Sequence, residues 1–564
     1  MDPRSVVEHI FFARARETPD GAAYYHQVEG TWRAVEWRDY ALAIQSATRA
    51  LHALGVVPGA RVAIVSDNRP EWAVLHLAAL AAGALSVGIY PNQPMDALCQ
   101  HLAATEAVLA LVDRPAHARE LIERAAKLPA LGHVVTVGSA AASTAVGALT
   151  WSDFLAAGER PGTNTTTERT GPVAGPAVIA MTPGTTGPGK AVVLTHENLL
   201  ATAGALIEAL AIGADDWTLS YLPLAHPLEQ ALSVHVPALV GSLVYYAEAP
   251  DKVARNLRQV QPSVFTATPR IWRAMHETVA VNLDQLTGWQ RALLGRARRV
   301  ATRVQAAEAR GQRPGLGVRT RYGLARYLFI DKLKGALGLK NARVCLSAGD
   351  HLAPDTHAFF ASLSITIREL YGQVETGYPI SVARDGAVRA GAVGTPVADI
   401  RIAENGELAV RGAGVCAGYL ADEGERAFVD ADGWWWTGDL CRVDRDGFLW
   451  VIGRADEVFT DSSGRVLGAR AVEHALVADP AIADAVAVVG DGGAIQVFLT
   501  ASGVDDPAID DVLARVAEGA PELPPIAAHT LLDRELTVEG GELTPMFTVK
   551  RAALARRYRQ KPAG

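Results

Sequence analysis

The stretch Met181-Thr-Pro-Gly-Thr-Thr-Gly-Pro-Gly-Lys190 lies between two apolar runs, Val178–Met181 and Ala191–Leu194. The runs predict two strands, joined by a loop that is rich in glycine and threonine and ends in lysine. Glycine lets a backbone turn tightly enough for several N–H groups to face one oxyanion, and the hydroxyls and ammonium add donors. The loop therefore predicts a phosphate-binding turn, with a plain Gly/Pro-rich hairpin as the alternative. Its spacing is not that of a Walker A loop.

Length and composition describe a globular protein of more than one domain. The chain has 564 residues, of which 49% are hydrophobic and 20% charged, so we expect at least two domains with ample core. The formal net charge of -8 argues against general nucleic-acid binding. Four cysteines without Cys-x-x-Cys spacing predict neither a zinc site nor a disulfide framework. A reducing cytoplasm is therefore the expected location.

The first part of the chain alternates helical and strand patterns. An amphipathic helix is predicted over 40–54, a buried strand over 61–65 and another over 107–112, as in a parallel α/β sheet. The apolar stretch from Trp72 to Tyr90 approaches the length of a membrane span. Because it contains His76 and two glycines, we interpret it as a buried helix over 71–82 and a strand over 85–90. No membrane span is predicted.

The remaining patterns complete an α/β architecture. Past residue 385 the chain becomes β-rich, with turns at Asn405-Gly406 and Asp446-Gly447. We predict a large N-terminal domain, residues 1–455, of two doubly wound α/β subdomains and a small β-barrel-like subdomain. A small mobile α+β domain, residues 456–564, follows. The stretch Arg291 to Lys334 carries Arg and Lys at helical spacing, which indicates a solvated helical face or, alternatively, loose contact with a membrane surface.

The loop at 181–190 resembles the ATP-binding loop of the adenylate-forming superfamily, which includes acyl-CoA synthetases, luciferases and adenylation domains. That family's pattern is Thr-Ser-Gly-Thr-Thr-Gly-x-Pro-Lys-Gly. The family serine is replaced by Pro183, which removes both a hydroxyl and a backbone donor. The matching positions, which the resemblance implies to bind the nucleotide, are Thr182, Gly184, Thr185, Thr186, Gly187 and Lys190.

Tyr371-Gly372-Gln-Val-Glu375 follows a predicted buried strand and resembles the superfamily's Tyr-Gly-x-Thr-Glu motif. The resemblance implies that Tyr371 stacks on adenine and that Glu375 binds magnesium. Val374 replaces the threonine that would contact the α-phosphate, so its hydroxyl is lost. A buried tyrosine beside a helix-terminal glutamate is the alternative reading. Nearby, Ala348 and Gly349 stand where the family has a small-residue shelf for adenine.

Two later blocks resemble the ribose-binding and hinge motifs of the family. Trp434-Trp-Trp-Thr-Gly-Asp439 implies that the aspartate holds the ribose hydroxyls, with a turn aspartate as the alternative. Gly453-Arg454 and the following Glu457 imply a ribose contact and the hinge of the small domain, respectively. Ser463 and Gly464 fall on the loop that lines the pantetheine tunnel for CoA in the family.

Leu222-Pro-Leu-Ala-His226 resembles the long-chain acyl-CoA synthetase branch and is predicted to be an apolar strand end that delivers a catalytic histidine. A strand-end histidine with satisfied hydrogen bonds is the alternative. The terminal stretch Leu543-Thr-Pro-Met-Phe-Thr-Val-Lys-Arg551 resembles the pattern Leu-Thr-Pro-Thr-x-Lys-x-Lys-Arg of the long-chain branch. The resemblance implies that the first lysine of this pattern carries out adenylation by neutralising charge on the α-phosphate and the carboxylate. Thr548 occupies that position. Lys550, roughly 6–7 Å further along an extended strand, is catalytic in an alternative register.

Pro183, Val374 and Thr548 all replace phosphate contacts, and each lost donor costs about 10²–10³ in rate. The departures predict an acyl-CoA ligase that transfers the acyl group of a bulky or long-chain acyl-adenylate to CoA and releases AMP, with adenylation weak or lost. Such a division resembles the non-adenylating ligases of diterpenoid-antibiotic (platensimycin-type) pathways and implies a separate adenylating enzyme. The alternatives are a complete synthetase using ATP and Mg²⁺, and an inactive relative that binds an adenylate. The sequence identifies neither the acid nor the oligomeric state.

Overall fold

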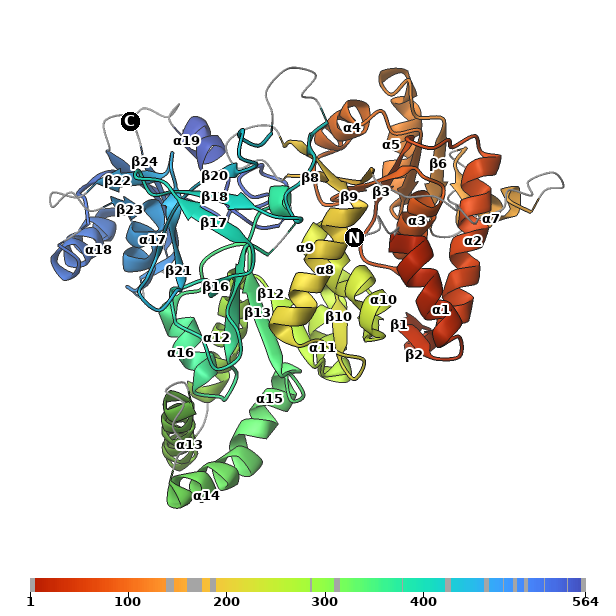
Figure 1. Cartoon of the computed structure of the whole chain (residues 1–564). Helices are drawn as coiled ribbons and strands as arrows, with labels where there is room; N and C mark the ends of the chain where they lie inside the picture. The colour runs from red at the N-terminus through yellow and green to blue at the C-terminus, as the bar shows by residue number, and fades with distance from the viewer. Residues whose placement is uncertain are drawn as a thin grey trace. The chain divides into compact units, whose positions relative to one another are not determined.

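The computed structural model describes residues 6–137, 147–159, 175–182, 189–284, 287–308, 315–377, 379–420, 428–460, 466–479, 481–489, 494–501, 506–521, 523–544 and 546–558 (Figure 1). The chain forms two compact units. Unit 1 comprises Met1–Thr182, Lys190–Ala398 and Gly412–Phe428, and unit 2 comprises Pro183–Gly189, Asp399–Arg411 and Val429–Gly564. Unit 2 thus begins upstream of the boundary predicted at residue 455. A hinge near Glu457 stays a prediction.

The first sheet of unit 1 contains the strands that flank the 181–190 loop. Its order is β19-β9-β8-β4-β3-β5-β6-β7, and the run from β8 to β7 is parallel. The strands are β3 (Arg61–Val65), β4 (Leu85–Ile89), β5 (Leu109–Val112), β6 (His133–Thr136), β7 (Leu149–Thr150), β8 (Pro176–Met181), β9 (Ala191–Thr195) and β19 (Gly418–Tyr419). The helices are η1 (Val7–Phe11), α1 (Phe12–Glu17), α2 (Trp37–Ala53), α3 (Pro70–Ala81), α4 (Met95–Ala104), α5 (Pro115–Glu123), η2 (Ala125–Lys127), α7 (Trp151–Ala157) and α8 (His196–Leu210).

The most apolar stretch of the chain is a buried helix followed by a strand, as predicted. Every residue of α3 from Trp72 to Ala81 is buried, and β4 is buried along its whole length. A helix that is apolar all round needs cover on every side, which α2 and the sheet provide here. Within the described parts of the chain, no helix combines the length and apolar character needed to cross a membrane.

The second sheet of unit 1 has the order β16-β15-β14-β13-β12-β10-β11-β1-β2, and it is parallel from β14 to β1. In the register of β13 and β14, Ala348 pairs with Leu370. The carboxyl ends of these strands therefore lie side by side, the usual location of a binding site in an α/β sheet. The strands are β1 (Ala22–Val28), β2 (Thr31–Glu36), β10 (Trp217–Ser220), β11 (Leu243–Tyr246), β12 (Val264–Ala267), β13 (Val344–Ala348), β14 (Ile367–Tyr371), β15 (Ser381–Val382) and β16 (Thr395–Pro396).

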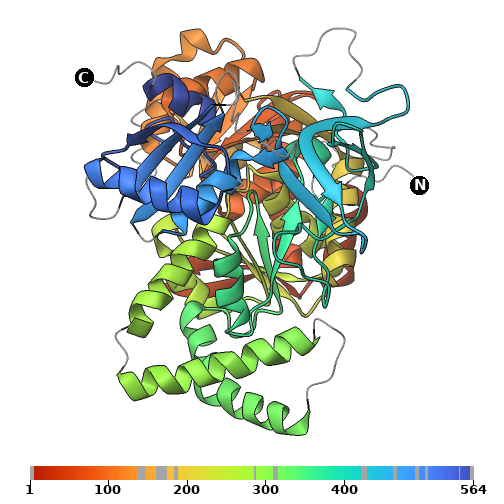
Figure 2. The same cartoon turned by 90° about the vertical axis from the view of Figure 1, so that its left-hand side faces the viewer.

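Helices cover this second sheet and extend beyond it. Figures 1 and 2 show α13 and α14 projecting from the remainder of unit 1 as a helical pair. The helices are α9 (Pro227–Gln230), η3 (Ala231–His235), α10 (Val236–Val240), η4 (Pro250–Lys252), α11 (Val253–Val260), α12 (Pro269–Asp284), α13 (Gly288–Glu308), α14 (Leu316–Ala325), η5 (Arg326–Ile330), α15 (Asp331–Leu337), α16 (Pro354–Ala361) and η6 (Val374–Thr376).

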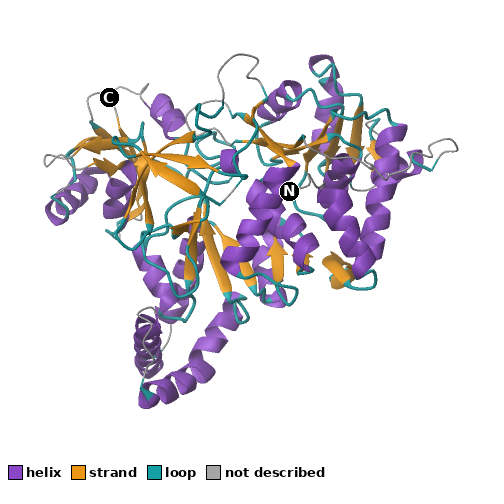
Figure 3. Ribbon diagram, viewed as in Figure 1, coloured by secondary structure: helices purple, strands orange, loops and turns teal. Residues whose placement is uncertain are grey.

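Unit 2 is built from short antiparallel strands and a small α+β part (Figure 3). Strands β17 (Asp399–Ile402), β18 (Glu407–Arg411), β20 (Trp435–Val443) and β21 (Leu449–Arg454) form one antiparallel sheet, with the predicted turns at Gly406 and Gly447. The rest comprises β22 (Val458–Thr460), β23 (Val466–Gly468), α17 (Ala469–Val477), β24 (Ile482–Val489), β25 (Ile495–Ala501), α18 (Asp506–Gly519), β26 (Ile526–Leu531) and α19 (Arg551–Tyr558).

Candidate active site

The loop at 181–190 connects β8 to β9, and its two ends are closed by hydrogen bonds. The Thr182 N–H donates to the Lys190 carbonyl at 2.8 Å, and the Lys190 N–H donates to Thr182 Oγ1 at 2.8 Å. The two strands that flank this segment are therefore as predicted. Pro183, Gly184, Thr185, Thr186 and Gly187 lie outside the described residues, so their contact with a nucleotide stays a prediction.

Tyr419 joins two residues that the sequence analysis treated separately. The Lys190 Nζ lies 4.5 Å from the centre of the Tyr419 ring, and the Tyr419 hydroxyl donates to Glu375 Oε1 at 3.0 Å. An ammonium over an aromatic face is attracted by its quadrupole. The end of the loop and the glutamate of the Tyr371–Glu375 motif thus meet within unit 1. Sequence reasoning missed Tyr419, because its place follows from the pairing of β19 with β9.

The Tyr371–Glu375 motif leaves the carboxyl end of β14 and enters the short helix η6. Val374 is buried, and the Glu375 carbonyl accepts a hydrogen bond from the Cys416 N–H at 2.8 Å. No group of three or more His, Cys, Asp or Glu side chains suited to a metal occurs among the described residues. Enzymes that act on phosphates typically hold Mg²⁺ with one or two carboxylates and the phosphates themselves. A single carboxylate at Glu375 fits that requirement.

The small-residue shelf after β13 ends in a turn that accounts for Asp350. Gly349 has a φ of 94°, a conformation that favours glycine. The Asp350 carboxylate accepts a hydrogen bond from the His351 N–H at 2.6 Å. His351 Nδ1 in turn lies 3.3 Å from the buried Glu369 carboxylate. Asp350 therefore stabilises the turn that follows Ala348 and Gly349, a role the sequence analysis did not find.

His226 lies in a turn and caps a helix, so the prediction of a strand end at Leu222–His226 is wrong. Strand β10 ends at Ser220, because a helix begins within the next few residues. His226 is the N-cap of α9, and its Nδ1 accepts from the Leu228 N–H at 3.3 Å. Burial lowers the pKa of His226 to about 4, so the ring is neutral at neutral pH.

Glu229, three residues after His226, is a buried carboxyl that the sequence analysis missed. Its Oε1 accepts hydrogen bonds from the hydroxyls of Ser220 at 2.7 Å and Ser233 at 2.8 Å. Burial raises the pKa of Glu229 to about 8, and the two hydroxyl donors oppose that shift only in part. A charged residue type inside the apolar run 222–236 was the available signal, since such a residue is rarely buried without a partner.

In unit 2, the two predicted ribose-binding residues lie opposite each other on neighbouring strands. Asp439 on β20 pairs in register with Arg454 on β21. The Arg454 Nη1 donates to the Thr437 carbonyl at 3.0 Å and to Asp439 Oδ1 at 3.4 Å. Gly438 has a φ of 72°, and a Cβ there would lie 2.9 Å from Arg454 Nη2. The structure therefore brings Asp439 and Arg454 together, while their contact with ribose remains a prediction.

The predicted hinge residue Glu457 is tied to the terminal motif by Arg551. The Arg551 Nη1 lies 3.3 Å from Glu457 Oε2, and its Nη2 lies 2.7 Å from Glu473 Oε1. Its Nε donates to the Ala487 carbonyl at 3.2 Å. Burial raises the pKa of Glu473, and the adjacent Arg551 opposes this. Ser463 and Gly464, the predicted tunnel residues, lie outside the described residues.

The terminal motif forms a tight turn that places Thr548 and Lys550 in different surroundings. The Thr544 N–H donates to the Thr548 carbonyl at 2.8 Å, and the Thr548 N–H donates to Thr544 Oγ1 at 3.1 Å. The Lys550 N–H donates to the Glu542 carbonyl at 2.8 Å. Partial burial lowers the pKa of the Lys550 ammonium. Thr548 thus has no charge to offer a phosphate, and Lys550 keeps one.

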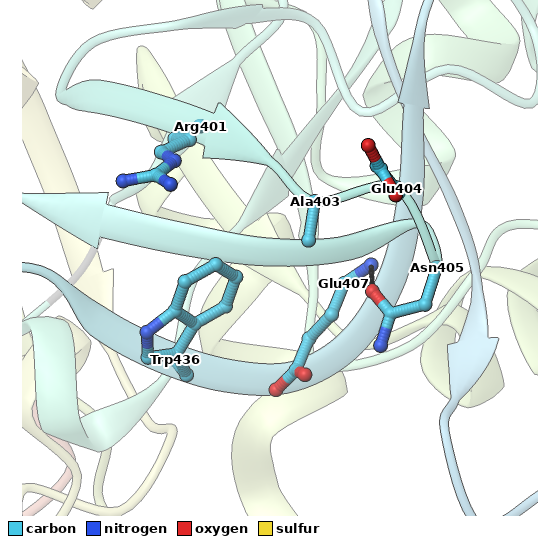
Figure 4. A pocket seen from close by; sticks show the side chains of 6 residues that line it. All are labelled: Arg401, Ala403, Glu404, Asn405, Glu407 and Trp436. Carbon is cyan, nitrogen blue, oxygen red and sulfur yellow. Dashed lines mark hydrogen bonds between the residues drawn. The ribbon is translucent and has the colours of Figure 1, made fainter.

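Unit 2 also contains a pocket with a volume of about 580 Å³, lined by residues other than these (Figure 4). The Arg401 guanidinium lies 5.8 Å from the centre of the Trp436 ring, and the Glu407 N–H donates to Asn405 Oδ1 at 3.0 Å. None of the predicted site residues lines it. Its lining residues are Arg401, Ala403, Glu404, Asn405, Glu407 and Trp436.

Comparisons with known proteins agree with the predicted family and fold. A family model described as "AMP-binding enzyme" matches residues 11–420. The chain is 30% identical to "Long-chain-fatty-acid--CoA ligase FadD15" of Mycobacterium bovis, over 99% of this chain and 97% of the relative. It is 29% identical to "Long-chain-fatty-acid--CoA ligase ACSBG2" of Rattus norvegicus, over 77% of this chain and 67% of the relative.

Two solved structures share the fold. The anthranilate CoA ligase AuaEII in complex with anthranoyl-AMP has a TM-score of 0.77 at 18% identity, covering 99% of this chain and 98% of its own. A benzoate CoA ligase from Burkholderia xenovorans has a TM-score of 0.71 at 18% identity, covering 98% and 99%. These likenesses confirm the predicted α/β fold with a smaller C-terminal part.

Proposed function

This chain belongs to the AMP-binding enzyme family and is an acid–thiol ligase, and from that premise we propose that it transfers an acyl group from an acyl-adenylate to CoA while its own adenylation step is weak or lost. The observation that supports this division is Thr548, which stands where the family places the adenylating lysine. Val374 removes a second phosphate donor, because its buried side chain has no hydroxyl. The adenosine-binding positions, in contrast, keep their polar groups.

In the proposed reaction the CoA sulfur forms a bond with the acyl carbon. The bond between that carbon and the phosphate oxygen breaks, AMP leaves with the electron pair, and the thiol proton passes to solvent. We assign adenine stacking to Tyr371, and contact with the ribose hydroxyls to Asp439 and Arg454. A carboxylate and a guanidinium side by side offer both acceptors and donors to a sugar diol. When bound at Glu375, Mg²⁺ would neutralise phosphate charge.

We assign His226 a positioning role. Its Nδ1 is engaged by the Leu228 N–H, and with a pKa of about 4 the ring is a poor proton acceptor at neutral pH. The relatives named long-chain fatty-acid ligases support a long-chain acyl group as the substrate. A bulky carboxylic acid, delivered as an adenylate by a separate enzyme, is the more specific form of the proposal.

The experiment gives the full chain two sets of substrates in parallel. One contains palmitate, ATP, Mg²⁺ and CoA, and the other contains palmitoyl-AMP and CoA. We expect thioester in the second at a rate at least about 10²-fold higher, the cost of one lost charge-stabilising donor. Comparable rates, with pyrophosphate released in the first set, would contradict the proposal.

A complete ATP-dependent synthetase is the second candidate, and Lys550 is the observation that favours it. Lys550 lies two residues after Thr548 and supplies an ammonium group within the same motif, with a pKa lowered by partial burial. Acid-dependent exchange of pyrophosphate into ATP would support this candidate. If pyrophosphate exchange is unchanged in Lys550→Ala, Lys550 takes no part in adenylation.

A further inference from the structure

The segment 288–340, which we call the basic arm, concentrates positive charge in one part of unit 1. It contains thirteen Lys and Arg residues and two Asp and Glu residues, although the whole chain has a formal net charge of -8. The arm comprises α13, α14, η5 and α15, of which α13 and α14 project from the sheet (Figures 1 and 2). A charge excess of this kind on a protruding element can attract an anionic surface.

Helix α13 has one face packed on unit 1 and one face in solvent. The Arg298 Nε donates to Ser362 Oγ at 2.7 Å, and its guanidinium lies 4.9 Å from the centre of the Phe359 ring. These contacts fix which side of the helix faces α16. Side chains three and four residues apart share a face: the buried ones are Leu294, Ala297, Ala301 and Val304, and the exposed ones include Arg296, Arg299 and Arg303.

Helices α14 and η5, which contact α13, carry an exposed apolar patch of their own. Leu324, Tyr327 and Leu328 are 61%, 76% and 38% exposed, and their spacing puts them on one face of the helix. The Tyr322 hydroxyl donates to Ser364 Oγ at 2.9 Å, which holds a different face against unit 1. Arg321 is exposed one turn before the patch. Large apolar side chains that gather in solvent in this way commonly mark an interaction site.

Four exposed arginines of the arm are available to a partner. Among the described residues, no acidic side chain pairs with Arg296, Arg299, Arg303 or Arg321, whereas Arg326 does pair with Asp331 at 3.2 Å. A second copy of this chain would bring two basic faces together, which like charges oppose. A purely polar acidic partner would leave the Leu324–Leu328 patch in water.

We propose that the basic arm docks on an anionic lipid bilayer, with Leu324, Tyr327 and Leu328 entering the headgroup region. Aliphatic and aromatic side chains beside arginines are the composition of interfacial helices, in which apolar burial and attraction to anionic lipids add. The alternation of arginine and apolar residues also suits the side chains themselves, because arginine stems can lie along the surface while their guanidinium groups reach phosphates. This inference is independent of which half-reaction the enzyme performs.

The test sediments the full chain with vesicles of equal parts phosphatidylglycerol and phosphatidylcholine, and with vesicles of phosphatidylcholine alone. We expect binding to the first that weakens when salt is raised to about 0.5 M, and far less to the second. The change Leu324→Ser/Tyr327→Ser/Leu328→Ser should lower the partition coefficient at least about tenfold. The change Arg296→Gln/Arg299→Gln/Arg303→Gln should lower it on the order of 10²-fold, since each basic residue contributes about fivefold.

The matched control is Leu42→Ser/Val57→Ser, two residues of unit 1 that are 55% and 61% exposed outside the arm. It should leave vesicle binding unchanged. Equal sedimentation with both vesicle types, or equal loss in the control, would overturn the proposal. The proposal would also be overturned by a chain that binds no vesicles but forms a dimer, or binds an acidic protein, through an association that the arm variants lose. If the apolar variant does not fold, as judged by near-ultraviolet circular dichroism, the arginine variant and the salt series decide.

Discussion

Thr548 and Glu229 are the individual residues whose predicted properties can be tested most directly. Thr548 lies in a turn closed by its own backbone hydrogen bonds with Thr544, so a longer side chain at this position would not disturb a packed core. Glu229 is buried with two serine hydroxyls as donors. Under the proposed function, Thr548 leaves its position without the cation that adenylation needs, whereas Glu229 introduces a titratable group into a buried region.

Restoring the lysine should restore adenylation. Thr548→Lys is expected to raise acid-dependent pyrophosphate exchange by about 10²–10³-fold, because it returns a charge to the transferring phosphoryl group. Release of AMP from acyl-AMP and CoA should change far less. The control is Thr548→Gln, which has similar length and no charge. An equal gain in both variants would show that length rather than charge limits the step.

The raised pKa of Glu229 makes stability depend on pH in a defined direction. The ordinary pKa of a glutamate side chain is 4.5, and burial raises the pKa of Glu229 in the folded chain to about 8. Between these values the unfolded chain releases the proton while the folded chain keeps it, so the free energy of unfolding falls as pH rises. Glu229→Gln should retain both serine hydrogen bonds and remove this pH-dependent contribution to the free energy of unfolding. We expect the variant to gain stability relative to the parent from about pH 5 to pH 8 in urea titrations. A difference in stability between variant and parent that stays constant across that pH range would contradict the raised pKa of Glu229.

At the scale of elements, the pairing of strands and the ends of helices place the site residues. The β19–β9 pairing puts Tyr419 beside Lys190, and the β20–β21 register puts Asp439 beside Arg454. In the C-terminal part, α19 begins with Arg551, whose guanidinium contacts Glu473 of α17 and the turn at Glu457. That one side chain links three elements.

Removing Arg551 should destabilise the C-terminal part of unit 2. Arg551→Met leaves the buried Glu473 carboxylate without its cation, and breaking a buried pair in this way costs about 3–5 kcal/mol. The matched control is Arg515→Met, which breaks the pair between the solvent-exposed Arg515 and Asp479 at 2.9 Å and should cost far less. Hydrogen exchange of β24 and β25 amides measures the difference. Equal protection in both variants would exclude a structural role for the Arg551 contacts.

For the whole molecule, the division into two units has a thermodynamic consequence. Each unit has its own apolar core: Trp72, Leu75 and Ile64 are buried in unit 1, and Val472, Leu476 and Val497 in unit 2. Units with separate cores tend to unfold in separate steps. We expect at least two calorimetric transitions, with Arg551→Met lowering only the one assigned to unit 2. A single transition that moves as a whole in this variant would show that the units unfold together.

The sequence by itself determined the family, the α/β class and the order of the motifs, because these follow from local patterns. Alternating apolar runs predicted β3, α3 and β4 closely, and short motifs predicted Asp439, Arg454 and Glu375 as site residues. Tertiary structure alone decided the rest. Tyr419 meets Glu375, and Arg551 meets Glu457 and Glu473, only because strands and helices distant in sequence pack together. His226 became a helix cap and Glu229 a buried acid for the same reason: burial and partners, which set a side chain's charge and hydrogen bonds, are properties of the folded chain.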